Sequence, residues 1–216
     1  VMTADPRYVT EAQSIAQLSY NEAMELSHFG AKVIFPATMQ PAMAQQVPIW
    51  VKNTFNPTHK GTCISKESDK GSGIIKGITS LKNICLISVE GSGMVGVAGV
   101  STRLFNTLSQ KNINVILISQ ASSEHSICIA VMREDAERAC VALTDTFIME
   151  LNAGQISSIN YEEGLAIVAI VGENMKNVPG VIAKVFSPLG RNGINVKAIS
   201  QGSSELNISI AINEHD

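Results

Sequence analysis

Gln120 and Gln201 carry the side chains best suited to hold a small polar ligand. Each ends an expected strand, and each is followed by a small residue and then by Ser-Ser-Glu. A side-chain amide donates and accepts hydrogen bonds at once, which suits a zwitterion or a hydroxyl group. Two other interpretations stay open: the residues stabilise a hairpin bend with a polar tip, or the second glutamine is simply inherited from a duplication.

A glycine-rich segment, residues 91–96, matches the pattern G-x-G-x-x-G that binds a dinucleotide between a strand and a helix. Three observations count against that chemistry. The related segment 172–177 lacks the second and third glycines, no acidic residue ends the next expected strand, and that strand turns into a hairpin instead of a parallel crossover. The hypothesis that the protein is an oxidoreductase with a nucleotide cofactor therefore rests on this segment alone.

Gly99 and Gly180 lie near the expected starts of two helices. Free N–H groups at a helix N-terminus attract a carboxylate, and a glycine leaves the backbone bare there. Pro179 is expected in the first turn, where its missing N–H group is tolerated. The alternative is that both glycines only let the helix approach the sheet closely.

The repeat shows no catalytic group or metal site. The histidines are scattered, and none has a nucleophile or base nearby in the sequence: His28, His59, His125 and His215. The cysteines form no C-x-x-C pair, which indicates small apolar residues in a reducing compartment: Cys63, Cys85, Cys128 and Cys140. We therefore expect no zinc site and no catalysis by this region.

The candidate residues belong to a unit that occurs twice. Residues 94–131 align with residues 175–212 without a gap, and about half of the aligned positions are identical. The predicted strands are 84–89, 113–120, 126–132, 156–160, 165–171, 194–201 and 207–212, and the predicted helices are 97–110, 134–151 and 179–191. This order predicts an α+β fold of tandem ferredoxin-like βαββαβ units with antiparallel sheets and helices on one face. Pro188 is expected to kink or shorten the last helix.

Residues 1–65 lie outside the repeat and are typical of the edge of an α/β layered domain. Ser19 is a plausible N-cap for a helix that Gly30 ends. The expected elements after it are a buried strand at 33–35, a helix within 38–46 and a strand at 47–52. Pro41 restricts this helix, which is expected to start near that proline. The charged and small residues 66–73 indicate a linker.

The composition is that of an ordinary soluble protein. Of the 216 residues 45% are apolar, so the chain can bury the cores of one to three domains. Its 16 basic and 19 acidic residues give a net charge of −3 without a basic cluster, which argues against nucleic acid or an anionic membrane as a partner. No apolar run can span a membrane and no secretion signal opens the chain, so a cytoplasmic location is expected. Both ends look cut.

Several segments resemble known proteins. Residues 3–7, 29–33, 52–54 and Gly61-Thr62 resemble the C-terminal end of the aspartate kinase catalytic domain, and the repeats resemble the paired ACT domains that follow it in that family. Residues 118–126 and 199–205 are most similar to those of bifunctional aspartate kinase–homoserine dehydrogenases. The resemblance covers essentially the whole chain.

The resemblance implies a function. Aspartate kinases phosphorylate the β-carboxylate of aspartate with ATP and Mg²⁺, and their ACT region binds an end product that inhibits the kinase. Arg7, Lys32 and Val33 match nucleotide-contacting positions; the alternative for the two charges is a solvated loop and a helix end. Because the family's amino-terminal phosphate- and substrate-binding segment is missing, we expect this chain alone to be inactive and to bind no nucleotide.

The resemblance also implies an effector site in the first copy. The matching positions are Met94, Val97, Gly99, Val100, Ser101, Asn114, Val115, Ile116 and Gln120. Lysine-sensitive members carry an acid at the position of Ile116, and a buried ammonium group without a carboxylate partner would cost several kcal/mol. Threonine is therefore the expected effector, and Gln201 marks a second site.

The expected organisation is a homodimer formed through the ACT domains, which would cover the sheet edges. The expected boundaries are 1–65 for the kinase part, 66–73 for the linker, 74–160 for the first ACT domain and 161–216 for a truncated second one. Two alternatives stay open: a stand-alone amino-acid-binding regulator and a lysine-sensitive monofunctional aspartate kinase. Whether a homoserine dehydrogenase domain follows Asp216 also stays open.

Overall fold

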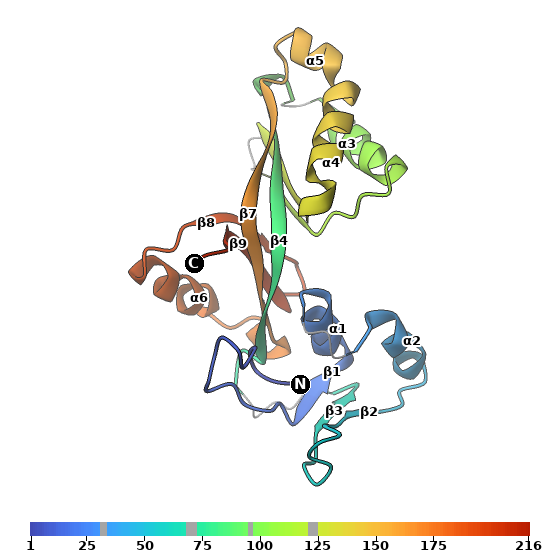
Figure 1. The fold of residues 1–216 in the computed structure, drawn as a ribbon, viewed down its shortest axis with the longest axis vertical. Coiled ribbons are helices and arrows are strands. Elements are labelled where there is room, and N and C mark those ends of the chain that lie inside the picture. The colour runs from blue at the N-terminus through green and yellow to red at the C-terminus, as the bar shows by residue number, and fades with distance from the viewer. Residues whose placement is uncertain (31–33, 68–72, 95–96, 121–124) are drawn as a thin grey trace. The chain divides into compact units, whose positions relative to one another are not determined.

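Figure 1 shows the computed structural model, which describes residues 1–30, 34–67, 73–94, 97–120 and 125–216. Contacts divide the chain into two compact units. The first unit contains residues 1–81, 167–195 and 201–210, and the second contains residues 82–166, 196–200 and 211–216. Both repeat copies therefore contribute strands to the second unit, whereas the helix of the second copy belongs to the first.

The first unit opens with a mixed sheet of three short strands in the order β1-β3-β2. Its elements are β1 (Gln17–Ser19), α1 (Tyr20–His28), α2 (Pro36–Ala44), β2 (Ile49–Val51) and β3 (Thr62–Ser65). β1 runs parallel to β3, and β2 pairs antiparallel with it. The core of this unit contains Ile15, Leu18, Tyr20, Ala23, Leu26, Met39, Ile64 and Val171.

The start of α1 is as the sequence predicts. Ser19 is the N-cap, and its Oγ accepts the Glu22 N–H at 3.1 Å, while a Glu22 carboxylate oxygen accepts the Ser19 N–H at 2.9 Å. This reciprocal pair is a capping box, which satisfies two N–H groups at the helix start. The helix ends at His28 with Phe29 as its C-cap, and Gly30 follows with φ 120°, a backbone conformation that favours glycine.

Two expectations for residues 34–46 are wrong. Neither Ile34 nor Phe35 lies in a strand, and Phe35 is the 71% exposed N-cap of α2. α2 starts at Pro36, which suits the first helical position, and it continues through Pro41. A proline inside a helix removes one hydrogen-bond donor but does not always end the helix, so Pro41 did not mark the start.

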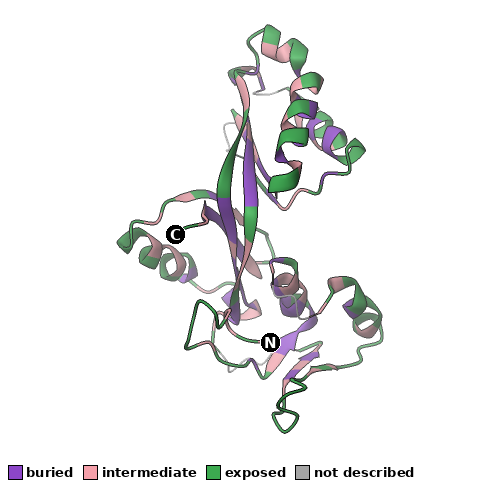
Figure 2. Ribbon diagram, viewed as in Figure 1, coloured by how far each residue is buried: buried purple, intermediate pink, exposed green. Residues whose placement is uncertain are grey.

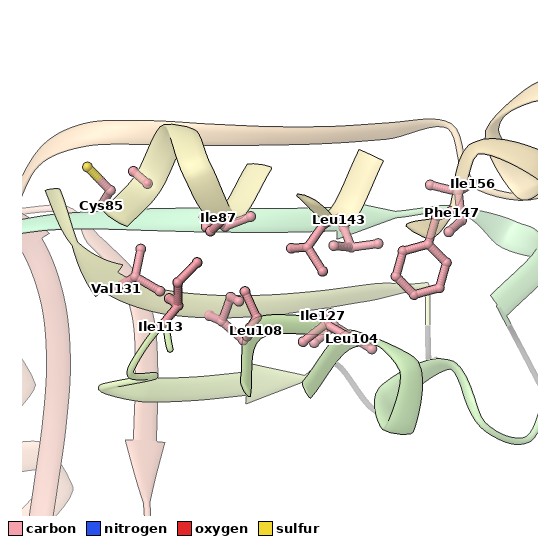
Figure 3. Close-up of a cluster of buried hydrophobic side chains, with 14 of the residues drawn as sticks. Cys85, Ile87, Leu104, Leu108, Ile113, Ile127, Val131, Leu143, Phe147 and Ile156 are labelled. Carbon is pink, nitrogen blue, oxygen red and sulfur yellow. The ribbon is translucent and has the colours of Figure 1, made fainter. Parts of the chain in front are cut away.

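In the second unit, helices pack on one face of antiparallel strands. The elements of this region are β4 (Gly77–Glu90), the 3₁₀ turn η1 (Ser92–Met94), α3 (Val100–Gln110), β5 (Leu117–Gln120), β6 (Ser126–Met132), α4 (Arg133–Thr146), α5 (Ile148–Asn152) and β7 (Ser158–Val171). β6 pairs antiparallel with both β4 and β5. The side chains of alternate residues on β4 and β6 meet those of α3 and α4 in one core, shown in Figure 3.

The second copy supplies the remaining elements. They are the 3₁₀ turn η2 (Glu173–Met175), α6 (Val181–Arg191), β8 (Val196–Gln201) and β9 (Asn207–Asn213). The complete six-stranded sheet has the order β5-β6-β4-β7-β9-β8. β7 is buried over most of its length from Leu165 to Val171 and largely exposed before it (Figure 2).

The predicted alternation of strands and helices in the repeat is largely confirmed, with several shifted boundaries. The separate strands expected at 156–160 and 165–171 are wrong, because β7 runs without a break from Ser158 to Val171. α3 and α6 begin later than expected, and the expected helix 134–151 divides at the fully buried Phe147 into α4 and α5. Pro188 does not shorten α6, which has 11 residues, as α3 has. None of the helices among the described residues is both long enough and apolar enough to cross a bilayer.

Candidate ligand-binding site

A cavity of about 600 Å³ lies in the first unit, between the start of α6 and the end of β8. Ten residues line it: Met175, Val178, Pro179, Gly180, Val181, Ile182, Gln201, Gly202, Ser203 and Glu205. All of them belong to the second repeat copy. The cavity is therefore built by two segments that the duplicated unit brings together.

The lining residues correspond to positions that the sequence singled out in the first copy. The counterparts of Met94, Val97, Gly99, Val100, Ser101 and Gln120 all line this cavity. Gln201 is itself one of the predicted site residues. The counterparts of Asn114, Val115 and Ile116 are not among the lining residues.

Gly180 gives this cavity a bare helix N-terminus. It is the N-cap of α6 with φ 84°, and no side chain caps the first turn. A Cβ atom at Gly180 would meet nothing within 4 Å, and the same holds for Gly99, whose φ is 95°. The left-handed backbone, and not close packing against the sheet, therefore explains both glycines. The uncapped N–H groups of α6 can receive a carboxylate.

Pro179 lies outside the helix. The sequence predicted it within the first turn, but α6 begins at Val181 and Gly180 is the cap. Pro179 instead lines the cavity next to the cap. Its fixed φ restricts the chain immediately before the left-handed residue.

Glu205 is a cavity residue that the sequence analysis did not single out. Its backbone is left-handed, with φ 54°, and its Oε2 accepts the Asn177 N–H at 2.8 Å. The carboxylate thus ties the loop before α6 to the tip of the β8–β9 hairpin. The sequence signal that could have indicated Glu205 is the repeated Ser-Ser-Glu after Gln120 and Gln201. The same pattern is equally typical of a polar turn.

Apart from Ser203, the remaining side chains that line the cavity are apolar. Met175 is 2% exposed and Val181 is 6% exposed, whereas Ile182 is 47% exposed. A ligand here would meet aliphatic side chains together with the Gln201 amide and the Glu205 carboxylate. Few polar groups in an otherwise apolar cavity are typical of a small-molecule site.

The predicted positions of the first copy are spread over several environments. Met94 is 4% exposed and belongs to the core of the second unit, with Val100 packed against that core, while Val97 is 54% exposed. Ser101 is half-buried in the first turn of α3. The other positions lie along one stretch: Asn114, Val115 and Ile116 in the coil before β5, and Gln120 exposed at its end.

Part of the first-copy site lies outside the described residues. The residues that correspond to Gly202, Ser203 and Glu205 fall in the segment 121–124, which the structure does not describe. The two copies also differ chemically. Ile182 stands where the first copy has Ser101, and the position of Ile116 is taken by Lys197, whose Nζ pairs with Glu162 at 2.7 Å.

Gly91 and Gly93 of segment 91–96 have a packing role, whereas Gly96 lies outside the described residues. A Cβ atom at Gly91 or Gly93 would lie 2.2 Å from the Gln155 carbonyl oxygen or 2.5 Å from the Gln155 Cβ, respectively. The Gly93 N–H also donates to the Gln155 carbonyl at 3.0 Å. In addition, β6 lies between β4 and β5, so these strands do not form the adjacent parallel pair of a dinucleotide fold. Close contact with Gln155 explains Gly91 and Gly93.

Of the three predicted nucleotide residues, Arg7 is the one that lies within the described part of the chain. Arg7 lies on a surface loop with an 81% exposed side chain and pairs with Asp5 at 2.6 Å. Hydrogen bonding and charge from Asp5 raise the pKa of Arg7, and the same contact lowers the pKa of Asp5. Lys32 and Val33 lie outside the described residues.

The cysteines are free thiols with low expected reactivity. Burial is the main cause that raises the pKa of Cys85, Cys128 and Cys140 above that of an ordinary thiol. Within the described ranges, no three His, Cys, Asp or Glu side chains come together as a metal site.

Comparisons with protein families match both parts of the chain. Residues 87–147 and 168–216 match the model of the ACT domain, and residues 1–53 match that of the amino acid kinase family. These ranges agree with the resemblance noted in the repeats and in the segment before them. The α+β fold with tandem ACT domains is confirmed.

Similar proteins carry this region as one part of a longer chain. The bifunctional aspartokinase/homoserine dehydrogenase of Daucus carota, named as chloroplastic, is 42% identical over 223 residues, which is 100% of this chain and 24% of that protein. Aspartate kinase of Clostridium acetobutylicum has a TM-score of 0.89 at 28% identity, covering 100% of this chain and 49% of that one. E. coli aspartokinase III in complex with lysine and aspartate has a TM-score of 0.77 at 30% identity, covering 100% and 46%.

Proposed function

Since this chain belongs to the ACT domain family, we propose that it is the regulatory region of an aspartate kinase and binds an amino acid as effector. The observation that carries the proposal is the cavity of the second copy, which combines an uncapped helix N-terminus with an amide, a carboxylate and an apolar wall. These are the groups that a free amino acid needs.

An amino acid can be placed in this cavity group by group. Its α-carboxylate meets the first N–H groups of α6, where the helix dipole also favours negative charge. Its ammonium group meets the Gln201 amide oxygen and the Glu205 carboxylate. Its side chain lies against Met175 and Ile182. Gln120, with Gly99 at the start of α3, marks the equivalent site of the first copy.

We infer threonine as the effector. In the first copy, the half-buried Ile116 suits the methyl group of threonine, and Gln120 can bond its polar atoms. The alternative is lysine, and one observation favours it: the similar E. coli aspartokinase III was crystallised with lysine and aspartate. In the second copy, Glu205 could also pair with a lysine ammonium group, so the two amino acids must be compared directly.

The wider function is part of the same proposal. The parent protein would phosphorylate aspartate with ATP and Mg²⁺, and effector binding would inhibit it. Arg7, Lys32 and Val33 would contact the nucleotide in the assembled kinase domain. The boundaries 1–65, 66–73, 74–160 and 161–216, pairing of two copies through the ACT domains and a cytoplasmic location remain predictions.

Calorimetric titration of this chain with threonine and with lysine tests the effector. We expect heat with threonine, and about fivefold weaker binding at the altered site in Gln201→Ala, because one hydrogen bond of about 1 kcal/mol is lost. Gln110→Ala, an exposed glutamine at the end of α3, is the matched control and should bind as the unaltered chain does. Heat with lysine alone would overturn the threonine assignment. No heat with either would overturn the sensor function.

A further inference from the structure

The N-terminus of α1 is joined to the η2 turn of the second copy by a set of short hydrogen bonds. The Glu22 side chain is fully buried, and its two carboxylate oxygens accept the N–H groups of Ser19 and Glu173, each at 2.9 Å. The Ser19 hydroxyl donates to the Glu173 carboxylate at 2.6 Å. We call Ser19, Glu22 and Glu173 the carboxylate clamp. It extends an ordinary capping box to a residue about 150 positions away in the sequence.

The clamp is held in place by packing on both sides. Val171, just before the turn, is buried in the same core as Leu18 and Tyr20, and its carbonyl accepts the Lys76 N–H at 2.8 Å. A Cβ atom at Gly172 would lie 2.5 Å from the Ile74 carbonyl oxygen, so the backbone approaches this segment too closely for any larger residue. The turn therefore has little room to move independently of α1.

The same turn forms part of the cavity wall. η2 contains Glu173 and Met175, and the Met175 N–H closes the turn on the Gly172 carbonyl at 3.2 Å. Met175 lines the cavity and is 2% exposed. One short turn thus touches the ligand cavity at one end and the clamp at the other.

The first copy is anchored differently. Both copies share one bond of the turn, from the Gly91 N–H to the His125 carbonyl and from the Gly172 N–H to the Leu206 carbonyl. Ser92, however, stands at the position of Glu173, and the turn of the first copy is bonded through the Gly93 N–H to the Gln155 carbonyl at 3.0 Å. The acid of the clamp is therefore a feature of the second copy. We call residues 1–53, which match the amino acid kinase family, the kinase-like segment. The duplicated unit has diverged at the residue that contacts this segment.

We propose that the second-copy cavity is the site coupled to the kinase-like segment, and that the carboxylate clamp transmits its occupancy to α1. This proposal rests on the proposed function, because it needs an amino acid in the cavity. A ligand that holds Met175 restricts η2, and through Glu173 it fixes the first turn of α1. Ligand binding in the cavity and the ordering of the first turn of α1 are then linked by one coupling free energy. Each of the two therefore favours the other to the same extent.

Hydrogen exchange of the whole chain, with and without saturating threonine or lysine, tests the coupling. We expect the ligand that gives heat to slow exchange of the Ser19, Glu22 and Glu173 amides at least about fivefold, the lower range of measured couplings. Glu173→Ser installs the residue of the first copy. In this variant the protection added by the ligand should fall below about twofold, and the affinity of the cavity should fall by no more than the factor by which the protection falls. Glu173→Gln keeps an acceptor for the Ser19 hydroxyl and should keep part of the protection.

The controls separate this proposal from the proposed function. Glu137→Ser makes the same chemical change at an exposed position of α4 and should leave both protection and affinity unchanged. Heat without protection of the clamp amides, or equal protection in Glu173→Ser, would overturn the coupling and leave the sensor function standing. A loss of affinity larger than the loss of protection would make Glu173 a ligand contact and overturn its role as a relay. No heat with either amino acid would overturn both.

Discussion

Gly180→Ala tests whether the start of α6 depends on a left-handed backbone. Gly180 has φ 84° and open space where a Cβ atom would lie, so the substitution introduces backbone strain without a steric clash. An L-residue in this conformation costs about 1–2 kcal/mol. The lower entropy of the unfolded chain offsets about 0.4–1 kcal/mol of that cost. The expected net loss of stability is about 1 kcal/mol.

Gly190→Ala is the matched control on the same helix. Gly190 lies inside α6, its φ is not left-handed, and a Cβ atom there would also meet nothing within 4 Å. Alanine should therefore stabilise the first unit by about 0.5–1 kcal/mol. The two variants should differ by nearly 2 kcal/mol although they add the same methyl group.

Urea unfolding followed by tryptophan fluorescence measures this difference. The chain has a single tryptophan, Trp50, and it lies in β2 of the first unit, together with α6. With a denaturant slope of about 1–3 kcal/mol per molar urea, the two midpoints should lie about 1 M apart. Equal midpoints, or a Gly180→Ala variant as stable as the unaltered chain, would refute the argument from backbone conformation. Gly180→Asn should lose less than Gly180→Ala, because asparagine tolerates this conformation better.

Two further predictions concern the second unit. The hydrogen bond from Arg103 lowers the pKa of Glu150, so this pair stabilises the folded state above the ordinary glutamate pKa and the effect is lost as the pH falls through the lowered value. Glu150→Gln should cost at most about 1 kcal/mol at pH 7 and less at pH 3 by urea unfolding followed by circular dichroism; an equal cost at both pH values would contradict this. Leu143→Ala should cost about 2–5 kcal/mol in the same assay, because Leu143 is fully buried in the core of Figure 3. Val141 is 56% exposed, so Val141→Ala should cost less than about 1 kcal/mol. Similar losses in the two variants would contradict the core assignment.

Local patterns predicted the elements whose signals are local. Ser19 before a helical pattern predicts the cap of α1, and the duplicated unit predicts the strand–helix–strand–strand order. The prolines were less informative, because Pro41 and Pro188 are both tolerated inside helices. A missing donor weakens a helix by an amount that tertiary packing can offset, so the sequence cannot state where such a helix ends.

The candidate site was only partly predictable. Gln201 was singled out because it recurs in both copies, and six counterparts of the first-copy positions do line the cavity. Glu205 was missed, because its bond to the Asn177 N–H joins residues on two different loops. In the first copy, the residues after Gln120 that correspond to Gly202, Ser203 and Glu205 lie outside the described residues.

The sequence by itself determined that a unit is duplicated, which residues recur in both copies, and that a kinase-like segment precedes them. Only the tertiary structure decided why Gly99 and Gly180 are glycines, and only it placed Glu173 against Ser19 and Glu22. The reason is physical: periodicity and capping act over one or two helical turns, whereas backbone conformation at a cap and contacts between distant segments depend on how the elements pack. The two copies differ at Ser92 and Glu173, and in the folded chain it is Glu173 that contacts Ser19 and Glu22.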